Sequence, residues 1–363
     1  MVLFTGMMTA GRAQAQGARG WNAEAAARYL DGRAATWKAH HETQRSHDTA
    51  CISCHTGLPY LLARPELRRV LGEATWPEPE RALVSDVEKR ARLWAEVEPW
   101  YAHTADKVQE SKGTEAILNA LVLALRDREG GETSPLTLAA FDHMWKEQRK
   151  DGPEKGGWRW LEFGLAPWET RESEIRGASL ATLAVRAAPG YAAEAAAREP
   201  LALLERYLRG KASEPLNLHS RLGLLWASSV SKDLLSAEQQ ASIIALVLAG
   251  QRSDGGFGLG QLGRWERGDG SPAVDESDGY ATGLVTYVLL RRRDPTLRPV
   301  IERGLSWLET HQDRDGFWPA TSANRSRKDD DVFVRFFMRD AASGYAVLAL
   351  CEAGSLRTSL LEK

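Results

Sequence analysis

Three side chains that could hold a cofactor lie together near the start of the sequence, in the pattern Cys51-Ile52-Ser53-Cys54-His55. This C-x-x-C-H pattern is typical of covalent haem attachment, in which two thiols react with the vinyl groups and the adjacent imidazole ligates the iron. The sequence has 3 Cys in total, and Cys351 lies far from the other two. The pattern predicts a haem c attached to Cys51 and Cys54, with His55 as the metal ligand.

Three other interpretations fit the same residues. The two thiols could form a redox disulfide, bind zinc together with nearby histidines, or be inert. The sixth iron ligand is open as well: a filled position would favour electron transfer and an open one small-molecule chemistry. The candidates for it are His40, His41, His47, Met144, His219 and Met338.

The N-terminal residues favour export. Residues 1–10 are largely apolar, and 13–15 have the small-x-small form of a signal-peptidase site, although a charged n-region is missing. We expect residues 1–20 to be a signal peptide, with a plain tail as the alternative, and the protein to be periplasmic or otherwise exported. Export agrees with the haem prediction, because haem is attached to c-type proteins outside the cytoplasm, where free thiols tend to oxidise.

The composition excludes some functions. Across 363 residues, 47 basic and 49 acidic side chains leave a formal charge of -2, so no basic field predicts a nucleic-acid partner. No later apolar run approaches the roughly 18 residues of a membrane-spanning helix. The 43% hydrophobic content and the 13 Trp are ample for a large core.

One structural unit recurs along the chain: an outer helix, a Gly-rich turn, and an inner helix that is apolar on most sides. The turn reads Asp-Gly-Gly-Phe at 254–257 and Asp-Gly-Phe-Trp at 315–318, each shortly after a Gln, and Gly-Gly-Trp at 156–158 marks an upstream copy. Such runs cannot stay helical, so each ends the outer helix. Tyr280 and Tyr345, each in a Gly-Tyr-Ala triplet, are predicted to occupy the same point of the unit.

These turns between paired helices resemble the repeat of the squalene-hopene cyclase and prenyltransferase β-subunit superfamily. The resemblance implies an all-α fold, an (α/α)6 toroid in which two concentric helix rings surround a cavity. We expect residues 21–355 to form this single domain and 356–363 a C-terminal tail. From periodicity and breakers, the outer helices are expected near 22–39, 83–101, 135–148, 200–210, 236–250 and 298–312, with inner helices starting near 53, 113, 173, 217, 277 and 338.

The starts of the inner helices hold the candidate catalytic residues, because in such a toroid they would line one mouth of the cavity. A carboxyl group that points into an apolar cavity can be kept protonated by burial, which suits a general acid. Helix capping is the alternative role for the acids. The candidates are Asp278, Asp275, Glu115, Asp340 and Tyr280.

Two arginines near the same mouth, Arg176 and Arg339, are predicted to bind haem propionates or another anion. The expected function is a haem-dependent redox or electron-transfer role with a periplasmic electron-transfer partner. The resemblance implies an alternative, a terpenoid-cyclase-like enzyme that acts on a hydrophobic ligand, although the Asp-x-Asp-Asp acid of such cyclases is missing from the inner-helix starts. The remaining alternatives are a toroid that binds a ligand or partner without catalysis, and zinc in place of haem.

Overall fold

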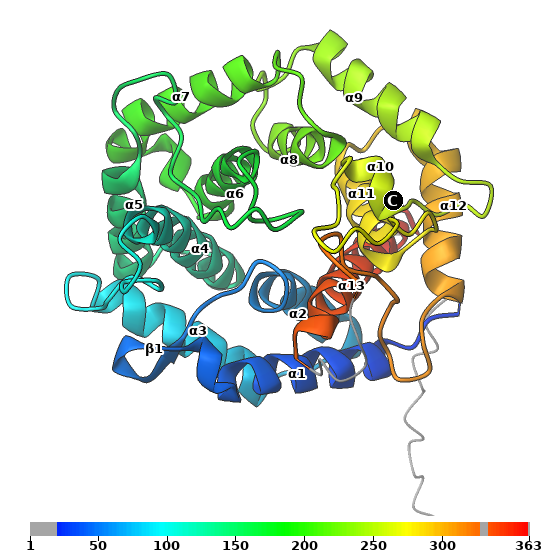
Figure 1. Ribbon diagram of the computed structural model, residues 1–363, viewed down its shortest axis with the longest axis horizontal. Helices are drawn as coiled ribbons and strands as arrows, with labels where there is room; N and C mark the ends of the chain where they lie inside the picture. The colour runs from blue at the N-terminus through cyan, green and yellow to red at the C-terminus, as the bar shows by residue number, and fades with distance from the viewer. Residues whose placement is uncertain (1–19, 327–332, 362–363) are drawn as a thin grey trace, which may run out of the picture.

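Two concentric rings of helices make up the protein, as the computed structural model shows (Figure 1). The structure describes residues 20–326 and 333–361, so nearly all of the predicted signal peptide lies outside the described residues. Within this part of the chain, the predicted all-α toroid of six helix pairs is confirmed. The outer ring holds α1 (Ala23–Ala39), α3 (Glu78–Arg92), α5 (Pro135–Glu147), α7 (Ala195–Lys211), α9 (Ala237–Gly250) and α12 (Arg298–Thr310). The inner ring holds α2 (Gly57–Leu71), α4 (Lys107–Gly130), α6 (Ser173–Ala187), α8 (Leu218–Ser228), α11 (Gly279–Arg291) and α13 (Phe337–Leu361).

The second helix pair differs from its predicted bounds. α3 begins at Glu78 rather than near 83, because the prolines at 77 and 79 suit the N-cap and first turn of a helix. α4 begins at Lys107 rather than near 113, so Gly113 lies inside the helix. A Cβ atom at Gly113 would lie 2.1 Å from the carbonyl oxygen of Arg159, so this glycine serves close packing and does not mark a helix start.

Each Gln of the repeated turn fastens its unit to the next outer helix. The Nε2 amide of Gln251 donates to the carbonyl oxygen of Gly255 in its own turn and to that of Val300 in α12, both at 2.9 Å. One side chain thus hydrogen-bonds a backbone carbonyl in the turn of its own unit and another in the outer helix of the next unit. The equivalent bonds join Gln148 to Gly156 and to Pro200 of α7, and Gln312 to Gly316 and to Asn22, the N-cap of α1.

The Gln312 bonds also close the ring. The Nε2 amide of Gln312 donates to the carbonyl oxygen of Asn22 at 3.0 Å, and the Asn22 amide donates back to Oε1 at 2.6 Å. In the inner ring, α13 packs against α2. The first and last units are therefore neighbours, as the toroid prediction required.

A glycine in each of these turns is required by backbone geometry. Gly156, Gly255 and Gly316 have φ values of 98°, 90° and 94°, a region that residues with a Cβ rarely adopt. At Gly316 a Cβ atom would also lie 2.1 Å from the carbonyl oxygen of Ala25 in α1. The turn motif thus allows the loop to touch the backbone of the next outer helix.

The predicted equivalence of Tyr280 and Tyr345 is wrong by one helical turn. The hydroxyl of Thr282 accepts from the Phe257 amide, and the hydroxyl of Ser343 accepts from the Trp318 amide, so Thr282 and Ser343 occupy equivalent positions. In this register Tyr280 precedes its reference residue by two positions and Tyr345 follows its own by two. A shift of four residues keeps both tyrosines on the same helix face, which is why the sequence pattern alone was misleading.

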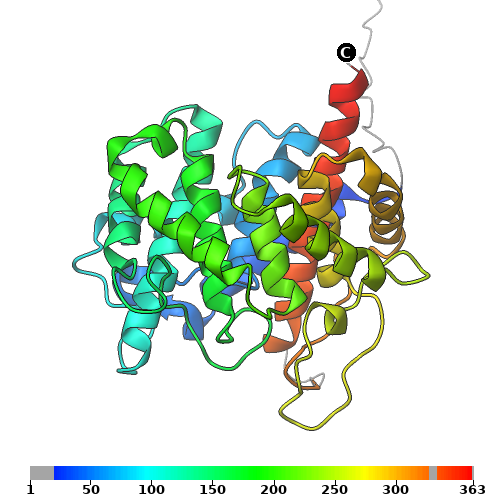
Figure 2. The same cartoon turned by 90° about the horizontal axis from the view of Figure 1, so that it is seen from above.

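Figure 2 shows that the long loop before α11 and the start of α13 lie on one face of the ring, while the C-terminal end of α13 lies on the other. We call the first face, where the inner helices begin, the mouth. The mouth also carries α10 (Leu259–Leu262) and two short strands, β1 (Gln44–Arg45) and β2 (Thr49–Ala50), which pair antiparallel between α1 and α2.

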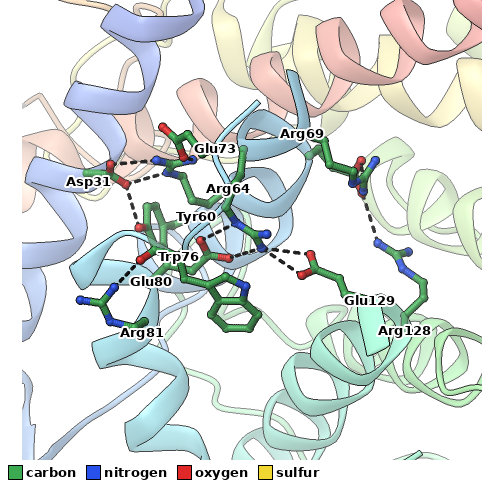
Figure 3. A network of polar contacts seen from close by, with 12 residues as sticks. Asp31, Tyr60, Arg64, Arg69, Glu73, Trp76, Glu80, Arg81, Arg128 and Glu129 are labelled. Carbon is green, nitrogen blue, oxygen red and sulfur yellow. Dashed lines mark hydrogen bonds and ion pairs between the residues drawn. The ribbon is translucent and has the colours of Figure 1, made fainter. Parts of the chain in front are cut away.

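A buried ion network stabilises the opposite face, near the C-terminal end of α2 (Figure 3). Arg64 Nε donates to Oδ1 of Asp31 in α1 at 2.9 Å. Arg68 pairs with Glu80 of α3 at 3.2 Å and with Glu129 of α4 at 3.0 Å. The network joins four helices, and because the Glu80 side chain is only 1% exposed, its negative charge depends on Arg68.

Candidate functional site

The C-x-x-C-H segment forms a buried turn between β2 and α2. The Ser53 hydroxyl accepts from the backbone amides of Thr56 at 3.0 Å and Gly57 at 2.9 Å, and so caps the start of α2. Trp37 Nε1 donates to the carbonyl oxygen of Cys51 at 2.8 Å. The turn is thereby tied to both helices of the first unit.

Both thiols of the segment are free and buried. Burial raises the pKa of Cys51 to about 11 and that of Cys54 to about 12, while the nearby charge of Arg176 partly opposes the effect at Cys54. The thiols are therefore protonated at neutral pH and weakly nucleophilic in this state.

His55 is half-buried among aromatic side chains. Its ring stacks on Phe337, with centroids 3.7 Å apart, and meets the edge of Trp37 at 5.0 Å. Burial, together with the positive charge of Arg33, lowers the pKa of His55 to about 3. The imidazole is therefore neutral at physiological pH.

The neighbours of His55 determine which of its nitrogens carries the proton. The Thr56 hydroxyl donates its only proton to Oδ2 of Asp340 at 2.7 Å, so it can only accept from Nδ1 of His55, which lies 3.0 Å away. His55 is thus the Nδ1–H tautomer, and Nε2 keeps a free lone pair. A histidine that ligates a metal commonly donates its other ring N–H to a carboxylate, a carbonyl or a water; here the acceptor is the Thr56 hydroxyl.

Asp340 is one of the predicted catalytic residues, and the structure places it behind Thr56. It is 2% exposed and accepts from Arg33 Nε at 2.9 Å and from the Tyr29 hydroxyl at 2.6 Å. Burial raises the pKa of Asp340, and Arg33 opposes that rise. With all its neighbours donating to it, Asp340 acts as an acceptor that orients other groups.

Tyr280, Arg176 and Cys54 are brought together at the centre of the mouth. Trp168 Nε1 donates to the Tyr280 hydroxyl at 2.9 Å, and this hydroxyl lies 2.8 Å from Nε2 of His219. Burial lowers the pKa of His219 well below its usual value, so the ring that hydrogen-bonds to Tyr280 is neutral. Tyr280 is fully engaged by these two bonds.

Arg176 has one buried nitrogen without a partner. Its Nη2 donates to the Tyr345 hydroxyl at 2.8 Å, but its buried Nε has no hydrogen-bond partner among the described residues. A buried guanidinium nitrogen is costly to leave unsatisfied, so an acceptor, either an ordered water or a ligand group, is expected there.

The other predicted acids have structural partners. Asp278 caps α11: its Oδ1 accepts from the amides of Tyr280 and Ala281 at 2.8 and 2.9 Å, and its Oδ2 from that of Leu259 at 2.6 Å. Burial nevertheless raises its pKa to about 6, and it lines a pocket of about 350 Å³.

Glu115 and Asp275 lie away from the centre of the mouth. Glu115 is buried in an ion pair with Arg90, close to Cys51, and burial raises its pKa. Asp275 is 89% exposed and pairs with Arg252 at 2.7 Å. A catalytic role for Asp278, Glu115 or Asp275 stays a prediction.

The zinc alternative needs at least three converging ligands. Within 20–326 and 333–361, no three His, Cys, Asp or Glu side chains form a group that could hold a metal ion. Nor does any helix in these ranges have the length and apolarity to cross a membrane.

Sequence reasoning missed Thr56, Arg33 and Phe337. Thr56 directly follows the C-x-x-C-H pattern, so its position in the sequence could have assigned it to the site. Arg33 and Phe337 come from α1 and α13, and no sequence pattern links them to the site. Arg339, predicted to bind propionates, donates from Nε to the Tyr29 hydroxyl at 3.0 Å, and its role in binding an anion stays a prediction.

No protein-family model and no curated protein matches the chain. Solved structures share its fold. The unsaturated glucuronyl hydrolase of Bacillus sp. GL1, responsible for the degradation of glycosaminoglycan, is 13% identical with a TM-score of 0.53, over 91% of this chain and 96% of that one. A glycosidase is 11% identical with a TM-score of 0.50, over 92% and 100%. These likenesses establish the toroid fold, and both structures are glycoside hydrolases rather than terpenoid cyclases.

Proposed function

We propose that this protein is an exported toroid that carries one covalent haem at its mouth and transfers electrons to a periplasmic partner. One observation carries the proposal: Thr56 and Asp340 hold His55 as the neutral Nδ1–H tautomer, which leaves the Nε2 lone pair free for iron. Cys51 and Cys54 would form the thioether bonds. A bound haem would supply one-electron redox chemistry.

The surroundings of the turn fit such a group. The unpartnered Nε of Arg176 is suited to a propionate, since a guanidinium binds carboxylate through charge-assisted hydrogen bonds. Phe337 and Trp37 flank the His55 ring. Asp340 holds the orientation of His55 through Thr56.

The test is expression in a periplasm that has the cytochrome maturation system. The wild-type protein should gain the mass of one haem and show a Soret band. A Cys51→Ala/Cys54→Ala double variant should show neither, whereas the matched control Cys351→Ala, which removes the other buried thiol, should behave as wild type. His55→Ala should keep the haem mass but change the spectrum. Wild-type protein with the apo mass and no Soret band would refute the proposal.

A second candidate function, hydrolysis of a glycan, rests on Glu169. Burial raises the pKa of this half-buried carboxyl to about 7, which suits a general acid near neutral pH, and its charge acts on Cys54 at the mouth. Unsaturated disaccharides from glycosaminoglycans are the substrates to assay. Glu169→Gln should lower kcat about 100-fold or more, while Glu162→Gln, an exposed acid in the same loop, should not. No turnover by the wild type would exclude this candidate.

A further inference from the structure

A second pocket, in addition to the one that Asp278 lines, lies at the mouth where the loop before α11 meets the segment that leads into α13. It is separate from the C-x-x-C-H turn. Its volume is about 550 Å³, within the usual range for small-molecule sites. Phe336 lines this pocket, whereas the next residue, Phe337, stacks on His55. The two sites are therefore adjacent but distinct.

The pocket is strongly basic. Four arginines line it, and none of its described lining residues is Asp or Glu. They are Arg267, Arg325, Arg335 and Arg339. Arg267, Arg325 and Arg339 form no ion pair with any carboxylate in the described part of the chain; Arg267 and Arg339 bond instead to uncharged groups. Unlike the usual protein surface, where acids and bases are interspersed, this hollow concentrates one sign of charge.

Two of the arginines are held in place before any ligand arrives. Arg267 Nη2 donates to the carbonyl oxygen of Ser322 at 2.8 Å. Arg339 lies between two aromatic rings, 4.0 Å from the centroid of Phe317 and 3.9 Å from that of Phe336. Because their orientation is already fixed, less side-chain entropy is lost when these groups bind an anion.

We infer that this pocket binds a small molecule with two or more anionic groups, namely carboxylates, sulfates or phosphates. Guanidinium groups from different segments can each meet a separate anionic group, which selects for several charges at once. Arg325 is exposed and bonds to no described side chain, so it is available to a ligand. The inference does not depend on the haem proposal, because it uses none of the residues of the C-x-x-C-H turn.

Calorimetric titration of the purified protein tests the inference, with citrate, pyrophosphate and a sulfated disaccharide as probes and glucose as the neutral control. At least one anionic probe should bind, and its affinity should fall with added salt. Its identity distinguishes a carboxylate, phosphate or sulfate ligand.

A matched pair of variants locates the binding. Arg325→Gln removes one charge from the pocket and should weaken binding about tenfold. Arg314→Gln removes one charge from an exposed loop outside the pocket and should leave affinity unchanged. Absence of binding to the wild type, or equal weakening in both variants, would overturn the inference.

Discussion

The Thr56 hydroxyl lies 2.7 Å from Oδ2 of Asp340, across a separation of 284 residues. This bond joins the start of α2 to the first turn of α13, and thus the first unit of the toroid to the last. It also determines the chemistry of His55, because a hydroxyl that donates to a carboxylate can only accept from the imidazole. One contact between the first and last units therefore also determines the tautomer of the candidate ligand.

Thr56→Val should release His55 from its single tautomer. Without the hydroxyl, Nδ1 has no acceptor at 3.0 Å, and protonation at Nε2 becomes competitive. Nitrogen-15 NMR of the imidazole in haem-free protein should show a protonated Nδ1 in the wild type and a mixture in the variant. Thr36→Val, at an exposed threonine of α1 that bonds only within its helix, is the control. A wild-type spectrum with the proton on Nε2 would contradict the assignment.

Gly283→Ala should destabilise the toroid by several kcal/mol. Its Cβ would lie 2.6 Å from the backbone nitrogen of Ala346, so α11 and α13 would have to move apart. Gly32→Ala in α1 is the counterpart: no atom lies within 4 Å of its Cβ position, and alanine should stabilise the helix by about 0.5–1 kcal/mol. Urea unfolding measures both. Equal effects would show that inner-helix packing is not this close.

Arg68→Met should cost about 3–5 kcal/mol, because it leaves the carboxylate of Glu80 buried without its partner. Arg298→Met breaks an ion pair whose side chains are 77% and 50% exposed, and should change stability little. Chemical denaturation at neutral pH compares the two. If Arg68→Met unfolds like Arg298→Met, the network at the C-terminal end of α2 contributes little to stability.

Asp278 should make stability depend on pH. Burial raises its pKa in the folded protein from 3.8 to about 6, so the folded state binds this proton more tightly than the unfolded chain. Its contribution is full below about pH 4 and is lost as pH rises through about 6, a change of about 3 kcal/mol at most.

Asp278→Asn removes the titrating group while keeping an N-cap side chain. The stability of the wild type relative to this variant should therefore fall between pH 4 and pH 7, as urea unfolding at both pH values would show. A relative stability that rises over this range would mean that the three backbone amides, rather than burial, dominate the pKa of Asp278.

The helix pairs, their order and the C-x-x-C-H segment could be predicted from the sequence, because each depends on neighbours in the chain. Gly-rich runs end an outer helix whatever surrounds it. The repeated turn that follows each Gln is partly held by hydrogen bonds between residues close in the chain. The role of Gly113 was mispredicted because a glycine that ends a helix and a glycine that allows close packing look the same in a local pattern. The equivalence of Tyr280 and Tyr345 was mispredicted because a shift of one helical turn leaves a residue on the same helix face.

Only the tertiary structure decided what the predicted site residues touch. Asp340 supports Thr56 and His55, Asp278 caps α11, and the guanidinium of Arg339 faces the second pocket. The four arginines of that pocket come from three stretches of the chain, at 267, at 325 and at 335–339. Such groupings cannot be seen in the sequence, because folding brings together side chains that are far apart in the chain. Burial among these side chains then determines which groups are charged and which imidazole nitrogen carries a proton.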